Sequence, residues 1–337
     1  MKKKFWLGLA LASLMAVTAA CGSNGGGKTT EGGNSEGKEY TVAISQIVEH
    51  PSLDATREGF LKALEDAGLK VKVDYNNAQG DPNNFKSIAE KIASGKSDLA
   101  LGIATATSSA LVEAVKDKPV LFAAVTDPLG EKLVPQLQAP GGNVTGASDT
   151  NPDAIVQLMD FIAKEFPDVK KVGVVINEGE PNAVVMTNIA QEALAKHGIE
   201  IVKAAVVNSS DVQQAAQSLV GRVDAVYVTL DNTVVEGVES IIDVVTEHDI
   251  PFFSADRDTV EKGAFATVGF KYFDHGYEVG QMAVEILKDG KKPGDMNVRT
   301  PEKLDFILNL SAAEELGITV TDAMKAYVKD PENNIIK

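Results

Sequence analysis

The sequence predicts an α/β protein made of two lobes, each with a parallel sheet. Short apolar stretches alternate with amphipathic helical patterns along most of the chain, which is the rhythm of strand–helix–strand units with right-handed crossovers. The stretch Asp98–Val115 (DLALGIATATSSALVEAV) is one such unit, because an apolar run ends in small hydroxyl residues and turns into a helical pattern. Such a run is typical of a strand buried on both faces of a sheet. A similar stretch returns at Asp224–Glu239 (DAVYVTLDNTVVEGVE), which indicates a second copy of the layout.

The two copies differ in charge where their strands end. When the stretches are superimposed, Thr107 falls on Thr233 and Thr105 falls on Asp231. A strand that turns into a helix leaves free N–H groups and the positive end of the helix dipole at the turn, which favours an anion. One loop offers neutral hydroxyls and the other a carboxylate, so two facing loops of this kind predict a clamp for a small zwitterion.

The composition is that of a globular chain with room for two domains. The sequence has 337 residues, of which 44% are hydrophobic, and a formal net charge of −16 at pH 7. This charge argues against binding to nucleic acid or anionic lipid through a basic face. We therefore expect no nucleic-acid partner.

The first residues predict an export signal rather than a part of the fold. Lys2–Lys4 precede the apolar run Phe5–Val17, which is too short for an ordinary membrane span and is followed by small residues. We assign residues 1–20 to this signal. Cys21, the only cysteine, stands at the cleavage point and is expected to carry a lipid anchor, with plain secretion as the alternative. The glycine- and serine-rich residues 21–39 predict a flexible linker.

Strands and helices alternate in the first lobe. Gly68 ends the first helical pattern, and Asp81-Pro82 supplies an N-cap and a first-turn proline to the second. We expect strands at Tyr40–Ser45, Val71–Tyr75, Leu99–Ile103, Pro119–Ala124 and Val144–Ala147, with helical patterns at Leu53–Gly68, Asp81–Gly95 and Leu111–Val115.

The second lobe repeats this layout and is followed by elements that must dock on one lobe or the other. Chain crossings are expected near Ala147, near Gly269 and after Gly290, so that residues 40–147 plus about 270–303 form lobe 1 and residues 148–269 plus part of the C-terminal segment form lobe 2. We expect strands at Val172–Ile176, Ile199–Ala205, Ala225–Val228, Pro251–Ser254, Ala264–Val268 and Leu304–Leu310, and helices at Pro181–His197, Asp211–Leu219, Val234–Val245, Tyr272–Leu287 and Ala323–Val328.

Motifs for catalysis or metal binding are absent from the sequence. It has no GxSxG, no HExxH and no glycine-rich dinucleotide motif after the first strand. We therefore expect no enzyme, no catalytic residue, no metal site and no cofactor. The histidines are scattered without the spacing of metal ligands, at His50, His197, His248 and His275.

Polar residues at the predicted carboxyl ends of the strands are the candidates for function, because ligands of open α/β sheets bind there. For any one of them the alternative is a helix cap or a turn residue. The candidates are Ser45, Gln46, Thr105, Ala106, Thr107, Thr126, Asp127, Glu178, Asn182, Asp231, Asn232 and Asp256.

Several blocks of sequence together resemble the substrate-binding proteins of ABC importers, and in particular the tryptophan/tyrosine-type family. The blocks are ISQIVEHP, NAQGD, IATATSSA, FAAVTDPLG, GGNVTG, NEGEPN and LDNTV, and the resemblance spans Tyr40 to about Leu310. It implies the type I periplasmic-binding fold, in which two Rossmann-like lobes close on a ligand around a hinge. It also implies delivery of the ligand to an ABC permease driven by a separate ATPase.

The segment that ends at Cys21 resembles a bacterial lipoprotein signal, although Thr18 stands where leucine is usual. Together with the family, it implies a lipid-anchored monomer on the extracytoplasmic face of the cell membrane.

An amino acid, aromatic in several members of such a family, is the expected ligand. An amino-acid site needs donors for the carboxylate and an acid for the ammonium. We assign the first role to Ser45 and the Thr105–Thr107 turn, and the second to Asp231. One of the aromatic residues in 270–273 (FKYF) is expected to line the cleft, whereas Tyr227, on a strand, is more typical of a core.

Other functions of the same fold stay open at this point. One is a sugar- or nucleoside-binding protein. Such sites commonly stack a tryptophan on the ring of the ligand, and the only tryptophan here lies in the expected signal. Another is a ligand-sensing module of a membrane signalling system. An intracellular repressor would need a DNA-binding headpiece before Tyr40, where the signal and the linker stand.

Overall fold

The computed structural model describes residues 37–301 and 304–337. The expected export signal and Cys21 lie outside the described residues. Within the described part of the chain, no helix combines the length and the apolar character that crossing a membrane requires.

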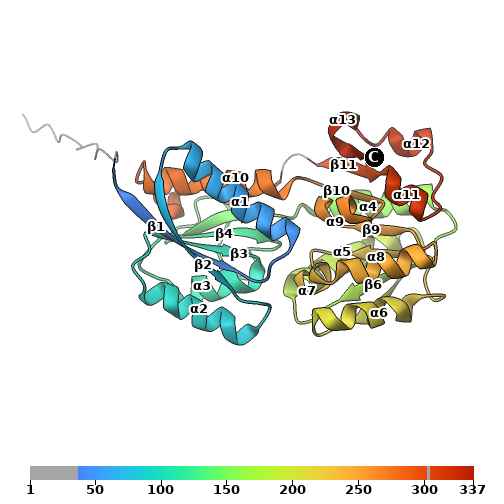
Figure 1. Cartoon of the computed structure of the whole chain (residues 1–337), viewed down its shortest axis with the longest axis horizontal. Coiled ribbons are helices and arrows are strands. Elements are labelled where there is room, and N and C mark those ends of the chain that lie inside the picture. Colours follow the sequence, from blue (N-terminus) through green and yellow to red (C-terminus); the bar gives the residue numbers. More distant parts are fainter. Residues whose placement is uncertain (1–36, 302–303) are drawn as a thin grey trace, which may run out of the picture. The chain divides into compact units, whose positions relative to one another are not determined.

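The first lobe is a parallel sheet with helices on both faces (Figure 1). Its strand order is β2-β1-β3-β4-β5, and every pairing is parallel. The strands are β1 (Glu39–Gln46), β2 (Lys70–Asn77), β3 (Leu99–Ile103), β4 (Val120–Val125) and β5 (Val144–Ser148), and the helices are α1 (Pro51–Asp66), α2 (Pro82–Ser94), α3 (Thr105–Ala114) and α10 (Tyr272–Leu287).

Strand β3 shows why the apolar run of the sequence becomes a central strand. Successive side chains of a strand point to opposite faces. Leu99 and Leu101 belong to the core cluster that holds Phe60 of α1 and Met282 of α10, whereas Ala100 belongs to the cluster on the other face. Because both faces are covered by helices, every residue of β3 is buried.

The second lobe is a mixed sheet of order β12-β11-β10-β9-β8-β6-β7, in which β11 runs antiparallel to β10. Its strands are β6 (Lys171–Ile176), β7 (Glu200–Ala205), β8 (Ala225–Val228), β9 (Phe252–Ser254), β10 (Ala266–Gly269), β11 (Asp305–Asn309) and β12 (Ile335–Ile336). Its helices are α4 (Pro152–Glu165), α5 (Pro181–Ala195), α6 (Val212–Leu219), α7 (Asn232–Glu236), α8 (Val238–Glu247), α9 (Arg257–Lys262), α11 (Leu310–Glu315), α12 (Asp322–Lys325) and α13 (Pro331–Asn334).

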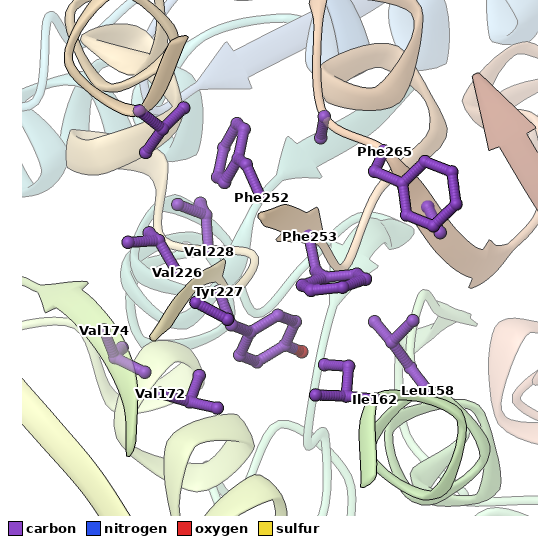
Figure 2. Close-up of a cluster of buried hydrophobic side chains, with 14 of the residues drawn as sticks. Leu158, Ile162, Val172, Val174, Val226, Tyr227, Val228, Phe252, Phe253 and Phe265 are labelled. Carbon is purple, nitrogen blue, oxygen red and sulfur yellow. The ribbon is translucent and has the colours of Figure 1, made fainter. Parts of the chain in front are cut away.

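The core of the second lobe is aromatic on the face that α4 covers. Tyr227 of β8 and Phe253 of β9 point from neighbouring strands toward Leu158 and Ile162 of α4 (Figure 2). All four residues are at most 1% exposed. This packing fixes the positions from which the loops after β8 and β9 begin.

The expected α/β class with two sheet-based lobes is confirmed, with differences in single elements. The structure adds helix α4, whose N-cap Asn151 and first-turn Pro152 the strand–helix pattern did not assign. The expected helix Val234–Val245 is two helices, because the chain breaks at Gly237. A Cβ at Gly237 would lie 3.0 Å from the Ser209 carbonyl oxygen, so only glycine allows this close approach without a shift.

The chain passes between the two sheets three times among the described residues, after β5, after β10 and before β11. Arg299 still pairs with Ala147 beside the first sheet, whereas Asp305 already belongs to the second. These connecting segments border the site described next.

Candidate functional site

Two cavities lie where the carboxyl ends of both sheets meet, and residues from both lobes line them. We call the first the polar cavity, and its lining consists of His50, Ser52, Leu53, Ala124, Thr126, Asp149, Asn182, Leu230, Asn232, Val235, Asp256 and Tyr272. We call the second the apolar cavity, and its lining consists of Asp149, Thr150, Asn151, Ala154, Ile155, Leu158, Met186, Tyr227, Leu230, Ala255, Val268, Gly269, Phe270 and Leu304. The two cavities share Asp149 and Leu230.

Two long helices begin at the polar cavity. Ser52 and Leu53 stand in the first turn of α1, and Asn182 stands in the first turn of α5. Each helix has a proline at its first position, where a missing N–H costs nothing. The first-turn amides of a helix have no partner within the helix and carry the positive end of its dipole. The polar cavity therefore suits a negatively charged group at these two helix ends.

Two carboxylates also line the polar cavity, and no lysine or arginine does among its described lining residues. Asp149 follows β5, where Tyr272 donates a hydrogen bond to its Oδ2 (3.2 Å) and Thr150 donates one to its Oδ1 (3.0 Å). Burial raises the pKa of Asp149 to about 6 in spite of these donors. An added positive charge would hold this carboxylate in its ionised form.

Asp256, the second carboxylate, caps helix α9 and links the lobes. Its Oδ1 accepts the Thr259 N–H (2.8 Å) and the Ser52 hydroxyl (3.2 Å), and its Oδ2 accepts the Ser254 hydroxyl (2.9 Å). Ser52 belongs to the first lobe, so this contact exists only while the lobes are together.

His50 lines the polar cavity and has a ring nitrogen that no described residue uses. Its Nε2 lies 3.3 Å from Oδ1 of Asn232, whose Nδ2 donates to Glu180. The amide orientation makes Oδ1 the acceptor, so the proton of the neutral imidazole is on Nε2. Burial lowers the pKa of His50, which keeps the ring neutral. Its Nδ1 is then a bare lone pair, and it has no hydrogen-bond partner among the described residues.

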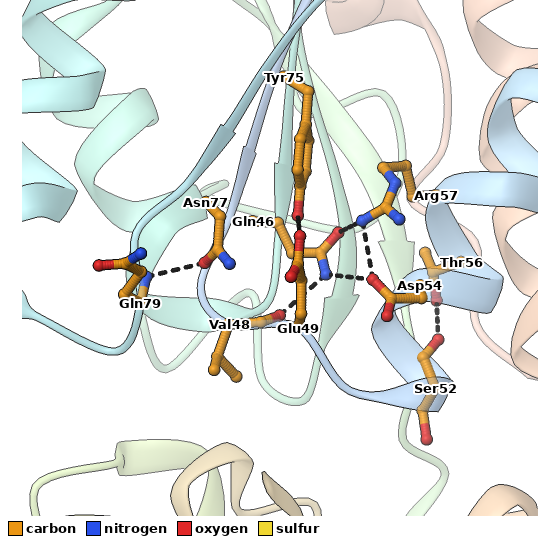
Figure 3. A network of polar contacts seen from close by, with 10 residues as sticks. All are labelled: Gln46, Val48, Glu49, Ser52, Asp54, Thr56, Arg57, Tyr75, Asn77 and Gln79. Atoms are coloured by element: carbon orange, nitrogen blue, oxygen red, sulfur yellow. Dashed lines mark hydrogen bonds and ion pairs between the residues drawn. The ribbon is translucent and has the colours of Figure 1, made fainter.

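The loop that carries His50 is held by Gln46 (Figure 3). The Gln46 amide donates to the Val48 carbonyl (2.8 Å) and to Asp54 (2.9 Å), and its oxygen accepts from Arg57 (2.7 Å). The side chain is thus fully used in shaping the turn from β1 into α1. Gln46 supports the site and does not line either cavity.

Asp231 is likewise occupied by the protein itself. Its Oδ2 accepts the Asn177 N–H (2.6 Å), and its Oδ1 accepts the Val234 N–H (3.1 Å) as the N-cap of α7. Burial, followed by the charge of Glu180, raises the pKa of Asp231. The cap of α3 is Ala104, so Asp231 corresponds in the structure to Ala104, one residue away from the match with Thr105 that the repeat indicated.

Glu180, at the start of α5, holds the chain segment that follows β8. Its two carboxylate oxygens accept the N–H groups of Asn232 (3.0 Å) and Thr233 (2.9 Å), together with the side chains of Asn182, Asn232 and Thr233. The carboxylate therefore replaces the missing backbone acceptors at the start of α7, and it fixes two amides that line the polar cavity.

The sequence-derived candidates fall into two groups. Thr126, Asn182, Asn232 and Asp256 line the polar cavity, and the other eight line neither cavity. Of these eight, Gln46 and Asp231 are bonded as described, and Ser45 is buried with an unpartnered hydroxyl. Thr105 and Ala106 lie in the first turn of α3, where Thr107 donates to the Ile103 carbonyl. Asp127 accepts the Gly130 N–H of a turn, and Glu178 pairs with Lys203 at the surface.

Sequence reasoning missed much of the lining. His50 and Ser52 flank Pro51 at the start of α1, as Glu180 and Asn182 flank Pro181 at the start of α5. This internal similarity is the signal that could have identified His50 and Ser52. Asp149 carries no such signal, because its role comes from the connection after β5. Phe270 and Tyr272 do lie in the aromatic stretch expected to line the cleft.

His275 of α10 does not line the polar cavity but holds Ala124, which does. Its Nε2 accepts the Ala124 N–H (3.0 Å), and Ala124 has a positive φ of 53° where the register of β4 and β5 shifts. Burial lowers the pKa of His275 to about 4, so the ring is neutral and can act as this acceptor. A strained backbone held by a buried partner is common beside ligand sites.

Both cavities are small in this conformation. Each has about 20 Å³ of space for the centre of a water molecule, which is room for about one water. An amino acid or sugar therefore enters only if the lobes part or the lining side chains move.

The fold defines a two-lobed α/β protein with two small cavities at the facing strand ends of its sheets. The family model described as ABC transporter substrate binding protein matches residues 41–330, and the chain belongs to this family. This membership confirms the expectation of a binding protein rather than an enzyme.

Two of the following three relatives are described by the ligand that they bind. The tyrosine-binding protein of Clostridioides difficile is 36% identical over 341 residues, which cover 98% of each chain. The ABC domain from Streptococcus pneumoniae in complex with L-Trp is 31% identical, with a TM-score of 0.81 over 88% of this chain and 100% of that one. The ligand-free, open structure of a substrate-binding protein from Clostridium difficile is 38% identical, with a TM-score of 0.64 over 88% of this chain and 98% of that one.

Proposed function

We propose that this protein is the solute-binding lipoprotein of an ABC importer and that it binds an aromatic amino acid between its lobes. In this proposal it is anchored through Cys21 on the extracytoplasmic face of the membrane, acts as a monomer and delivers its ligand to a permease with its ATPase. The observation that carries the proposal is that two unlike cavities share Asp149 and Leu230 in their linings, one lined by acids and helix ends and the other mostly by apolar side chains.

The polar cavity suits the backbone of an amino acid. Asp149 and the bare Nδ1 of His50 are acceptors for the ammonium, and Asp256 adds a second negative charge. The first-turn N–H groups of α1 and α5 are donors for the carboxylate. Both charges of the ligand thus meet partners when they leave water, which burial of a zwitterion requires.

The apolar cavity suits an aromatic side chain. Its lining shares Asp149 and Leu230 with the polar cavity and includes Ile155, Met186 and Phe270. An aromatic ring gains free energy from such surroundings through the area that it removes from water. The names of the relatives, tyrosine-binding and in complex with L-Trp, support the same class of ligand.

Ligand entry requires a change of conformation in this proposal. The TM-score is higher against the L-Trp complex than against the ligand-free open structure, although the sequence identity is lower. The hydrogen bonds between the lobes, from His50 to Asn232 and from Ser52 to Asp256, belong to this closed conformation. A ligand that contacts both lobes shifts the equilibrium toward it.

The test is calorimetric titration of protein that has been unfolded and refolded to remove carried ligand. We expect L-tyrosine or L-tryptophan to bind at least about tenfold more tightly than L-leucine, and glucose and ribose to give no heat. Binding of a sugar without binding of any amino acid would overturn the proposal. Cys21→Ala, expressed in a bacterial host that processes lipoproteins, tests the anchor, because loss of the lipid releases the protein from the membrane fraction.

A further inference from the structure

Tyr227 carries a hydroxyl that the protein leaves without a partner. The side chain is fully buried on β8, and its ring lies against Phe253 and α4, with the hydroxyl toward Leu158 and Ile162 (Figure 2). Among the described residues no group forms a hydrogen bond with this oxygen. A buried polar atom without a partner costs free energy, so a phenylalanine would fill the same place at lower cost.

The other tyrosines show that this is an exception in the chain. The sequence has six tyrosines, all within the described residues. The hydroxyls of five of them donate hydrogen bonds, to the Leu287 carbonyl from Tyr40 and to carboxylates from Tyr75, Tyr272, Tyr277 and Tyr327. The hydroxyl of Tyr227 is the one left over.

Tyr227 also lines the apolar cavity, together with Leu158 and Met186. Asp149 lines both this cavity and the polar cavity. A ligand with its ammonium at Asp149 and its side chain in the apolar cavity therefore meets Tyr227 beside the apolar side chains of Leu158 and Met186.

We propose that the Tyr227 hydroxyl is a specificity determinant that forms a hydrogen bond with a polar atom on the ring of the ligand, so that the site prefers a phenol or an indole to a plain phenyl ring. This proposal rests on the proposed function. A site that holds an unpaired hydrogen-bonding group rejects a ligand without the matching atom, because the group then stays unpaired in the complex. The hydroxyl both donates and accepts, so it pairs with the tyrosine O–H as well as with the indole N–H.

The experiment compares L-tyrosine, L-tryptophan and L-phenylalanine by calorimetric titration against wild type, Tyr227→Phe and Tyr327→Phe. The last variant is the matched control, because Tyr327 lies in the second lobe, bonds to Glu165 and lines neither cavity. We expect Tyr227→Phe to weaken the preferred polar aromatic ligand by about tenfold or more while L-phenylalanine changes by less than about threefold. Tyr327→Phe keeps the wild-type order of ligands.

The outcomes separate this proposal from the proposed function. If Tyr227→Phe changes the affinities for all three ligands by the same factor, Tyr227 is not a specificity determinant, although the site still binds aromatic amino acids. If wild type binds none of the three, the proposed function fails and this proposal fails with it. Thermal melts of the ligand-free proteins show that the variant is folded, and we expect Tyr227→Phe to melt at the wild-type temperature or above, since it removes an unpaired hydroxyl.

Discussion

The imidazole of His50 meets the side-chain oxygen of Asn232 at 3.3 Å, and this contact joins the loop after β1 to the loop after β8. The two loops belong to different sheets. Because Asn232 accepts, the second ring nitrogen of His50 is left as an acceptor beside the polar cavity. One side chain therefore links the two lobes and, in the proposed function, accepts a hydrogen bond from the ligand.

Replacing His50 by alanine removes both functions. We expect the affinity for the amino acid to fall by about tenfold to a hundredfold, the effect of leaving a buried donor without its acceptor. His197→Ala is the matched control, because His197 is a partly exposed histidine that pairs with Asp160 away from both cavities. Titration calorimetry of the two variants measures the difference, and equal affinities would show that His50 does not contact the ligand.

Asp149 predicts a pH dependence of binding. Burial raises its pKa to about 6 in the ligand-free protein, and an ammonium group prefers its ionised form. The affinity should therefore rise as the pH rises through 6, by about tenfold between pH 5 and pH 7. Asp149→Asn should bind weakly with little pH dependence, whereas Asp127→Asn, in a turn outside the cavities, keeps the wild-type profile. A wild-type affinity that is flat over this range would contradict the role of Asp149.

His275 predicts a loss of stability in acid. Its pKa is about 4 when folded, below the ordinary value of about 6.5. The unfolded chain therefore binds a proton that the folded one does not, and the stability due to this group is complete above pH 6.5 and is lost as the pH falls toward 4.

The matching variant is His275→Gln, whose amide oxygen replaces the acceptor for the Ala124 N–H without titrating. In urea unfolding, we expect wild type to lose about 2 kcal/mol more than the variant between pH 7 and pH 5. Other titrating groups contribute equally to both proteins and cancel in the difference. Parallel losses in the two proteins would show that His275 is not the group responsible.

Asp231 is predicted to act on stability rather than on affinity. Its two oxygens accept one backbone N–H each, from Asn177 and Val234. Asparagine has one oxygen, so Asp231→Asn leaves one buried N–H facing an amide nitrogen and should cost about 1–3 kcal/mol of unfolding free energy. Thermal melts beside calorimetry decide the matter, since an unchanged melting temperature with a large loss of affinity would return Asp231 to the ligand.

Strands buried on both faces were the elements that the sequence predicted best. The bounds of β3 and β8 agree with the expected ones, since a run such as LALGI has no polar position at which to end early. Helix α10 also begins and ends as its apolar pattern indicates. The close approach of Gly237 to the Ser209 carbonyl was not predictable, because it exists only after distant segments of the chain have packed together.

The candidate site shows the same division. The sequence alone determined that polar residues follow the buried strands, because the alternation of apolar runs and helical patterns locates the strand ends. Only the tertiary structure decided which of those residues are free for a ligand. Asp231 is hydrogen-bonded to Asn177, and Gln46 is hydrogen-bonded to Val48 and Arg57. In contrast, Asp149 lines both cavities, and the Nδ1 atom of His50 has no hydrogen-bond partner among the described residues. The physical reason is that a hydrogen-bonding atom binds whichever partner comes within reach, and several of these partners come from other elements of the chain.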